Sequence, residues 1–322
     1  ITREIITSDS THVNQILQRV APDFPQKVAS VIDHTYPNPQ VVQMISSQID
    51  ADRMDYLLRD AYNTGTKYGE FDLTRVLRVM RPYQGGIAFL ANGMHAVEDY
   101  IVSRFQMYQQ VYFHPVSRGM EVVLQRLLQR AKMLYEQPEH AQNLAPQLLI
   151  PFFKKQFTLD DYLKLDDGVL NTYFIYWLDY PDQILNDLAN RFLSRRPFKS
   201  VRFTTETERY LPKLQTLTEQ AGYDATYYTA VNNSFDLPYD AYDPSSKTPK
   251  TQIEIMQSDG TLEELSSLSP LVAAISGKFS GDERFYFPKE MLANSDIELF
   301  QPIYQEFKRY INNGSLQKPT TD

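Results

Sequence analysis

The chain has 322 residues, of which 42% are apolar and 22% charged, a composition typical of a soluble globular protein with a large core. Its net charge of −8 leaves no basic excess to neutralise a nucleic-acid backbone, which disfavours duplex nucleic acid as a partner. The lack of cysteine excludes disulfides, thiolate catalysis and cysteine-ligated metals, and it fits the reducing cytoplasm, where we expect the protein to act. Apolar runs of about five residues fall far short of the roughly 20 that span a bilayer, so we expect no membrane segment.

A helical pattern dominates the chain from residue 11 to about residue 195, because apolar residues recur there every three or four positions. Its clearest helix is expected over residues 50–63. A β-hairpin with a glycine turn is expected at residues 79–90, and helix resumes over residues 94–112 before Pro115 breaks it. Residues that typically start or end helices mark further bounds: Asn38 with Pro39, Gly65, Thr158 with Asp161, and Asp166 with Asp167.

Strand signals become frequent after residue 197, where the character of the sequence changes. The predicted elements are, in chain order, a strand at 201–205, a helix at 206–221, a strand at 227–231, a polar loop at 237–251 and a hairpin of 252–257 with 261–265. We therefore expect two domains, a helical one of residues 1–197 and a smaller α+β domain of residues 198–322 that serves assembly or regulation.

Common catalytic motifs are missing from the sequence. The five histidines are scattered, and no pair has the three- or four-residue spacing that brings two imidazoles to one face of a helix. The glycine-rich phosphate loops of P-loop and dinucleotide-binding proteins are also absent, as is the Gly-x-Ser-x-Gly turn of hydrolases. The most frequent enzyme classes therefore find no support.

Two stripes of polar side chains remain as candidates for chemistry. Asp52, Tyr56 and Asp60 are spaced four apart and share one face of the helix predicted at 50–63, with Arg53 beside them. Carboxylates, a phenol and a guanidinium in this arrangement can ligate a metal, hold a phosphate and bind a sugar hydroxyl. The same pattern also fits a solvated, salt-bridged helix face, which spacing alone favours.

The second stripe lies on the helix predicted at 94–112, where Arg104, Tyr108 and Tyr112 are again spaced four apart. A guanidinium followed by two phenols fits a phosphate clamp beside an aromatic wall for a nucleoside. A tyrosine-rich packing stripe between helices is the alternative, and spacing alone favours it.

A family resemblance rests on four segments: IDADRMDYLLRD at residues 49–60, DLTRVLR at 72–78, the stretch from Tyr100 to His114, and LDDG at 165–168. The first segment resembles the helix that carries the last metal-binding aspartate of HD-domain deoxynucleoside triphosphate triphosphohydrolases, and the last resembles bacterial members of that family. The resemblance covers about residues 1–200. It implies a mainly α fold, in which an HD-domain helical bundle is followed by the smaller α+β domain.

The resemblance implies that a deoxynucleoside triphosphate (dNTP) is hydrolysed to a deoxynucleoside and inorganic triphosphate. It implies a divalent metal ion (Mg, Mn, Fe or Zn) with Asp52 as its final ligand. The implied substrate contacts are, in chain order, Arg53 on the triphosphate, Tyr56 on phosphate, Asp60 on the sugar 3′-hydroxyl, Arg104 on the phosphates and Tyr112 against the deoxyribose, where a 2′-hydroxyl would otherwise sit.

The chain departs from the family pattern at several positions. The family's first ligand histidine and its adjacent His-Asp pair are absent, and Asp33-His34 has the reversed order. Because the chain starts at Ile1, we expect these ligands and the catalytic residues to lie upstream of it. Phe113 replaces a polar base-contacting residue of some relatives, and Tyr108 replaces a histidine, which leaves the general acid unassigned.

The resemblance further implies a homo-oligomer, often a tetramer, with dNTPs as effectors at subunit interfaces. Two other functions stay open. The chain is an inactive nucleotide-binding regulatory module if the full protein lacks the histidine ligands. It is an HD phosphohydrolase of another nucleotide if its products differ from inorganic triphosphate.

Overall fold

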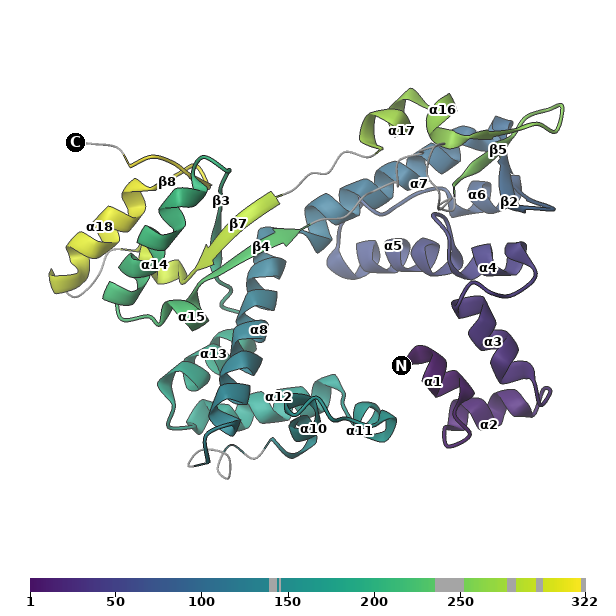
Figure 1. Cartoon of the computed structure of the whole chain (residues 1–322). Coiled ribbons are helices and arrows are strands. Elements are labelled where there is room, and N and C mark those ends of the chain that lie inside the picture. Colours follow the sequence, from purple (N-terminus) through teal and green to yellow (C-terminus); the bar gives the residue numbers. More distant parts are fainter. Residues whose placement is uncertain (139–143, 145, 235–251, 277–281, 294–297, 320–322) are drawn as a thin grey trace. The chain divides into compact units, whose positions relative to one another are not determined.

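The computed structural model describes residues 1–138, 144, 146–234, 252–276, 282–293 and 298–319. The chain divides into two compact units, one of residues 1–112 with 236–280 and the other of residues 113–235 with 281–322. Each unit is mainly helical and contains one small mixed sheet, as the elements labelled in Figure 1 show. Among the described residues, no helix has the length and apolar character required to cross a bilayer.

Unit 1 contains the first third of the chain and a later segment. Its helices are α1 (Thr2–Thr7), α2 (His12–Gln18), α3 (Phe24–Ile32), α4 (Pro39–Ile45), α5 (Ala51–Thr64), α6 (Leu73–Val79), the 3₁₀-helix η1 (Ala91–Gly93), α7 (Met94–Met107), the π-helix η2 (Tyr108–Tyr112), α16 (Leu265–Leu268) and α17 (Pro270–Ile275). Its strands are β1 (Met80–Tyr83), β2 (Gly86–Leu90), β5 (Glu254–Met256) and β6 (Leu262–Glu264).

Local capping explains several helix bounds of unit 1. The side chain of Asn38 accepts a hydrogen bond from the backbone amide of Gln40 at the start of α4, as expected for an N-cap. Gly65 ends α5 with φ of +69°, a left-handed conformation that glycine adopts at little cost. The predictions of a helix near residues 50–63 and a hairpin at residues 79–90 are confirmed.

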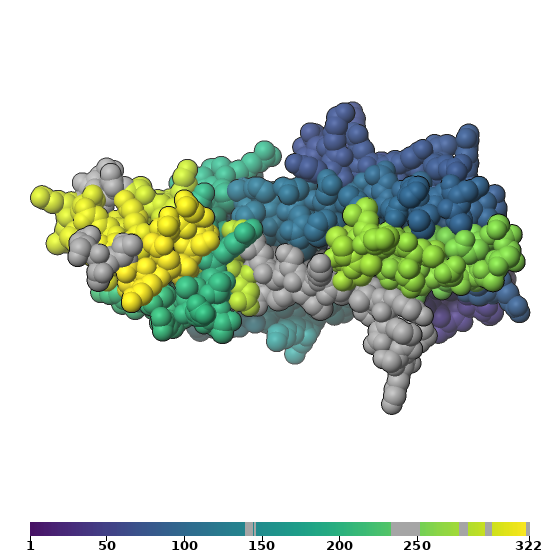
Figure 2. All heavy atoms as spheres, turned by 90° about the horizontal axis from the view of Figure 1, so that it is seen from above, coloured from purple at the N-terminus to yellow at the C-terminus, as the bar shows by residue number. Residues whose placement is uncertain are grey.

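The sheet of unit 1 joins two segments that are far apart in the sequence. Its strand order is β1-β2-β5-β6, and β2 pairs with β5 in parallel, with Phe89 opposite Ile255. The predicted hairpin around Gly260 therefore exists, but it completes a sheet of unit 1 instead of belonging to a C-terminal domain. Figure 2 shows this light-green segment, residues 252–276, lying along the blue atoms of α7.

The core of unit 1 forms where α5, α7 and the later segment meet. Its fully buried members are Leu57, Val76, Val97, Tyr100, Ile101, Met107, Ile255, Leu265 and Val272. These residues come from three separate stretches of the chain. Residues of β5, α16 and α17 therefore belong to the same buried cluster as those of α5 and α7 and help to stabilise the contact between these two helices. This packing positions the polar faces of α5 and α7 beside one another.

We expect Gly69→Ala to lower the free energy of unfolding by about 1–3 kcal/mol, the usual cost of overpacking a core. A Cβ at Gly69 would collide with the carbonyl oxygen of Leu57 and lie 3.0 Å from Cγ of Met107. It would therefore push α5 away from the end of α7, just before the π-helix. Denaturant unfolding of the variant measures the change, and an unchanged midpoint and slope would contradict this account of the α5–α7 contact.

Unit 2 contains the remaining described elements. Its helices are α8 (Pro115–Tyr135), η3 (Gln147–Leu149), α10 (Ile150–Phe153), α11 (Leu159–Leu163), α12 (Asp167–Tyr176), η4 (Trp177–Asp179), α13 (Gln183–Leu193), η5 (Glu208–Tyr210), α14 (Leu211–Gln220), α15 (Ala225–Tyr228), η6 (Lys289–Leu292), η7 (Glu298–Phe300) and α18 (Gln301–Arg309). Its strands are β3 (Lys199–Arg202), β4 (Ala230–Ser234), β7 (Asp282–Phe287), β8 (Ile311–Asn312) and β9 (Ser315–Leu316), in the sheet order β4-β7-β3-β9-β8.

The grouping of residues in unit 2 differs from the domains expected at 1–197 and 198–322. The physical reason is a shared core. Leu127 of α8 and Leu188 of α13 belong to the same buried cluster as Phe198, Ala230 and Tyr286 from the sheet region. Helices that precede residue 197 therefore pack with strands that follow it.

Two element predictions in unit 2 need correction. Tyr227 and Tyr228 lie in the short helix α15, because the side chain of Asp224 caps that helix through the amide of Thr226, and strand β4 begins only at Ala230. Helix α14 begins at Leu211, with proline in its first turn, and the residues before it form a 3₁₀-helix. The predicted capping box of Thr158 with Asp161 is confirmed. The loop predicted at 237–251 lies outside the described residues.

Candidate active site

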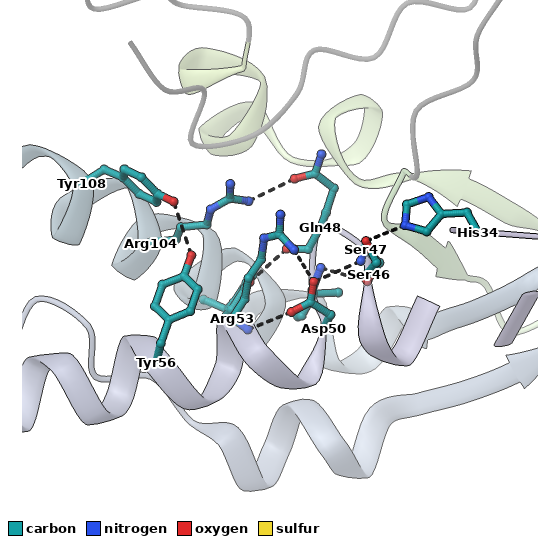
Figure 3. A network of polar contacts seen from close by, with 11 residues as sticks. His34, Ser46, Ser47, Gln48, Asp50, Arg53, Tyr56, Arg104 and Tyr108 are labelled. Atoms are coloured by element: carbon teal, nitrogen blue, oxygen red, sulfur yellow. Dashed lines mark hydrogen bonds and ion pairs between the residues drawn. The ribbon is translucent and has the colours of Figure 1, made fainter. Parts of the chain in front are cut away.

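The segment that leads into α5 is organised by one buried carboxylate, that of Asp50, which is 1% exposed. Its Oδ1 accepts a hydrogen bond from the amide of Arg53 at 2.7 Å, and its Oδ2 accepts one from the amide of Ser47 at 3.1 Å. Oδ2 also pairs with the guanidinium of Arg53 (Figure 3). Asp50 therefore caps α5 and compensates the charge of Arg53.

The Arg53 side chain remains charged and half-exposed in this arrangement. Burial opposes its charged form, but the neighbouring charge of Asp50 and the hydrogen bond to it raise the pKa of Arg53 above the ordinary arginine value. Arg53 is thus a fixed hydrogen-bond donor whose positive charge already has a partner.

The first predicted stripe is divided by the packing of α5. Asp52 is exposed, and within the described residues its carboxylate has no hydrogen bond or ion pair. Tyr56 and Asp60 are partly buried and approach α7 and the π-helix instead. The alternative of a solvated, salt-bridged helix face applies to two neighbouring residues, Arg59 and Asp55, which pair at 3.0 Å on the solvent side of α5.

The second stripe comes from α7 and the π-helix that continues it. Arg104 is 5% exposed, and its Nη1 donates a hydrogen bond to Oε1 of Gln48 at 3.0 Å. Its guanidinium carbon lies 5.6 Å from the ring centroid of Tyr108. The predicted helix at 94–112 is α-helical only to Met107, and π-helical segments of this kind are frequent at functional sites.

The two stripes meet through three tyrosines. The hydroxyls of Tyr56 and Tyr108 lie 3.3 Å apart, and the hydroxyl of Tyr112 donates to Oδ2 of Asp60 at 2.9 Å. The Tyr112 ring is edge-on to both others, with centroid distances of 6.1 Å to Tyr56 and 5.0 Å to Tyr108. Ring packing and a hydrogen bond together hold Tyr112 in one orientation.

The Tyr112 phenol is a hydrogen-bond donor at any ordinary pH. Burial, the hydrogen bond to Asp60 and the charge of that carboxylate all raise the pKa of Tyr112 well above the usual value for tyrosine. The phenol therefore stays protonated, and the Tyr112–Asp60 contact does not depend on pH through this group.

The described residues do not supply a complete metal centre. Among them, no group of three or more histidine, aspartate or glutamate side chains lies close enough together to hold an ion. His34 contacts the hydroxyl of Ser46, His95 pairs with Glu98, and His114 caps α8, so none of these three joins Asp52. Of the two carboxylates predicted for the site, that of Asp52 has no hydrogen bond or ion pair within the described residues and is suited to a metal, whereas Asp60 is bound by Tyr112 and Arg59.

The arrangement can bind an anionic, sugar-containing molecule. Arg53 and Arg104 offer guanidinium donors from two helices, the tyrosines form an aromatic wall, and Asp60 offers a carboxylate that accepts hydrogen bonds from hydroxyls.

The sequence analysis assigned no role to Gln48 or Asp50. The position of Asp50 before a helix start was a usable signal for a cap, whereas the contact of Gln48 with Arg104 spans 56 residues and left no trace in the sequence pattern.

Comparison with known proteins identifies relatives of the chain. A family model described as "HD associated region" matches residues 71–147, a range that includes Arg104 and Tyr112. The uncharacterized protein YwfO of Bacillus subtilis is 49% identical over 295 residues, which are 91% of this chain and 67% of YwfO. The uncharacterized MG461 homolog of Mycoplasma pneumoniae is 31% identical over 265 residues, covering 77% of this chain and 61% of that protein.

Solved structures share the fold. A phosphohydrolase (BT4208) from Bacteroides thetaiotaomicron aligns with a TM-score of 0.66 at 23% identity, covering 88% of this chain and 73% of that one. A hypothetical protein from Aquifex aeolicus aligns with a TM-score of 0.65 at 20% identity, covering 94% and 70% respectively. The expected mainly α fold is confirmed. The chain spans between 51% and 67% of the length of the curated relatives it matches.

Proposed function

Because the chain belongs to the protein family of Bacillus subtilis YwfO and carries an HD-associated region, we propose that it is part of a metal-dependent hydrolase that converts dNTPs to deoxynucleosides and inorganic triphosphate. The observation that carries the proposal is the meeting of two guanidiniums with a tyrosine–carboxylate pair. The guanidinium of Arg104 lies 5.6 Å from the ring centroid of Tyr108, and that ring packs edge-on against Tyr112, the donor to Asp60. Figure 3 shows Arg53 on α5 near Tyr56 and Arg104. A triphosphate and a sugar are the two groups that such a site would recognise.

Each side chain has a role that follows from its chemistry. Arg53 and Arg104 bind the phosphates as charged donors, and the Tyr56 hydroxyl adds a neutral one. Asp60 accepts a hydrogen bond from the sugar 3′-hydroxyl at Oδ1, which already accepts one from Nη1 of Arg59 at 3.2 Å and has a second lone pair to offer. The ring of Tyr112 packs against C2′ of the sugar, where it leaves no room for a ribose hydroxyl.

The proposed reaction is a hydrolysis at the α-phosphorus. A bond forms between phosphorus and the water oxygen, the bond from phosphorus to O5′ breaks, and O5′ leaves with a proton as the deoxynucleoside hydroxyl. The guanidiniums stabilise the charge that builds up on the phosphate oxygens. Asp52 would be one ligand of a divalent ion, which supplies Lewis-acid chemistry when bound.

Product analysis on the full-length protein tests this function. Each dNTP is incubated with Mn²⁺ or Mg²⁺, with mixed dNTPs present as possible activators, and the products are separated. We expect a deoxynucleoside and intact triphosphate in equal amounts. Release of pyrophosphate or single phosphates would instead identify a hydrolase of another nucleotide class, and tight nucleotide binding without turnover would identify a regulatory module.

A further inference from the structure

We propose that Gln48 is a positioning residue, which holds Arg104 in place and leaves the charge of that guanidinium available to an anionic substrate. The inference rests on the proposed function, since it concerns the same site. Gln48 lies in the bend between α4 and α5, outside any helix, so regular secondary structure does not fix its side chain. Contacts with α7 help to hold it in place.

Two residues one helical turn apart on α7 hold Gln48. The hydroxyl of Tyr100 donates to the backbone carbonyl of Gln48 at 2.9 Å, and Nη1 of Arg104 donates to its side-chain Oε1 at 3.0 Å. Tyr100 is fully buried, and burial raises its pKa far above the usual value, so its hydroxyl remains a donor. Backbone and side chain of one residue are therefore fixed against the same helix face (Figure 3).

The two guanidiniums of the site differ in how their charge is compensated. Arg53 faces the buried carboxylate of Asp50, whereas the side-chain acceptor of Arg104 is a neutral amide oxygen. Within the described residues Arg104 has no ion pair, and its buried Nε has no hydrogen-bond partner. A buried cation held by a neutral acceptor keeps its attraction for an anion, which a carboxylate at the same place would cancel.

The substitution Gln48→Glu tests this effect, because it keeps the size and the acceptor oxygen while it replaces the amide NH2 with a second oxygen and adds a negative charge. We expect Gln48→Glu to weaken binding of inorganic triphosphate, and of a non-hydrolysable dNTP analogue, by about 10- to 100-fold, the scale of losing one charge-assisted contact. Gln48→Leu, which removes the acceptor and leaves the cation, should weaken binding by less than about 10-fold. Calorimetric titration of the wild-type chain, of Gln48→Glu and of Gln48→Leu measures the three affinities.

Thermal unfolding separates positioning from simple structural support. Gln48→Leu leaves the Nη1 of Arg104 without its acceptor, so it should lower the Tm more than Gln48→Glu does, although it binds triphosphate better. If Gln48 only supported the fold, affinity would follow Tm in both variants, and that result would overturn the proposal. Gln43→Glu is the matched control. Oε1 of Gln43 accepts a hydrogen bond from the Ile87 amide at 2.7 Å, and Gln43 has no part in the site.

A double-mutant cycle assigns the effect to Arg104. In an Arg104→Ala background, Gln48→Leu should change triphosphate affinity by less than about twofold, because the guanidinium that Gln48 positions is gone. A wild-type chain that binds triphosphate, combined with a Gln48→Glu variant of equal affinity, would refute the role of Gln48 and leave the proposed function standing. A wild-type chain that binds neither probe would overturn both.

Discussion

Replacing Asp52 with alanine is expected to reduce triphosphate release by the full-length protein by at least about 100-fold, because outer-shell partners of metal ligands alone are worth about 10- to 100-fold. Asp52 is an exposed carboxylate in the first turn of α5, next to Arg53, and no described side chain binds it. Its loss should leave the fold intact, since an acid in a first helical turn contributes only about 0.3–1 kcal/mol. Product release and unfolding are measured on the same preparation.

Asp55→Ala is the matched control for this experiment. Asp55 lies on the same helix, is also exposed, and pairs with Arg59 at 3.0 Å. A surface pair of this kind adds roughly 0–1 kcal/mol, so the control should keep both its stability and its activity. An Asp52→Ala protein with wild-type turnover would remove Asp52 from the site. Equal losses in both variants would point to damage of α5.

The parts of the fold that could be predicted depend on contacts within a few residues. Asn38 binds the amide of Gln40, Asp50 binds that of Arg53, and Asp166 binds that of Val169 at 2.7 Å. Each cap joins residues two or three positions apart, so the sequence pattern contains both partners. Helix starts were therefore predictable wherever a cap of this kind defines them.

The division into units could not be predicted because it depends on pairing between distant segments. Strand β5 pairs in parallel with β2, and nothing in the local pattern of residues 252–257 indicates which strand it will join. Tyr227 and Tyr228 show the same limit on a small scale. Their β-propensity predicted a strand, but the cap at Asp224 placed them in α15.

The candidate site could be predicted only in part, because its two halves are local patterns and their contact is not. Helical spacing predicted the stripes of α5 and of α7 separately, and it contained no information that they would meet. Their meeting depends on contacts across 52 residues, between Tyr56 and Tyr108 and between Asp60 and Tyr112. The π-helix at residues 108–112 was also hidden, because a five-residue π turn has no distinct sequence pattern.

Tyr112→Ala is expected to admit ribonucleotides. The aromatic ring is held by Asp60 and by two edge-on tyrosines, so it cannot turn aside for a 2′-hydroxyl. Removing the ring opens the space that the proposed function assigns to this hydroxyl. The ratio of kcat/KM for dNTP over NTP should fall by about 10-fold or more, since filled space in a pocket typically discriminates by 10- to 200-fold. Competing dNTP and NTP in one assay measures the ratio directly.

Tyr112→Phe distinguishes the ring from its hydroxyl. It keeps the wall and loses only the hydrogen bond to Oδ2 of Asp60, so sugar discrimination should remain while KM changes for both substrate classes together. Discrimination that persists in Tyr112→Ala would show that another group reads the 2′ position. Equal loss of discrimination in both variants would assign the role to the orientation of Asp60 instead of the ring, because the Phe variant removes the Tyr112 hydrogen bond to that carboxylate without opening space. Only a loss confined to Tyr112→Ala makes the aromatic wall the element that excludes ribose.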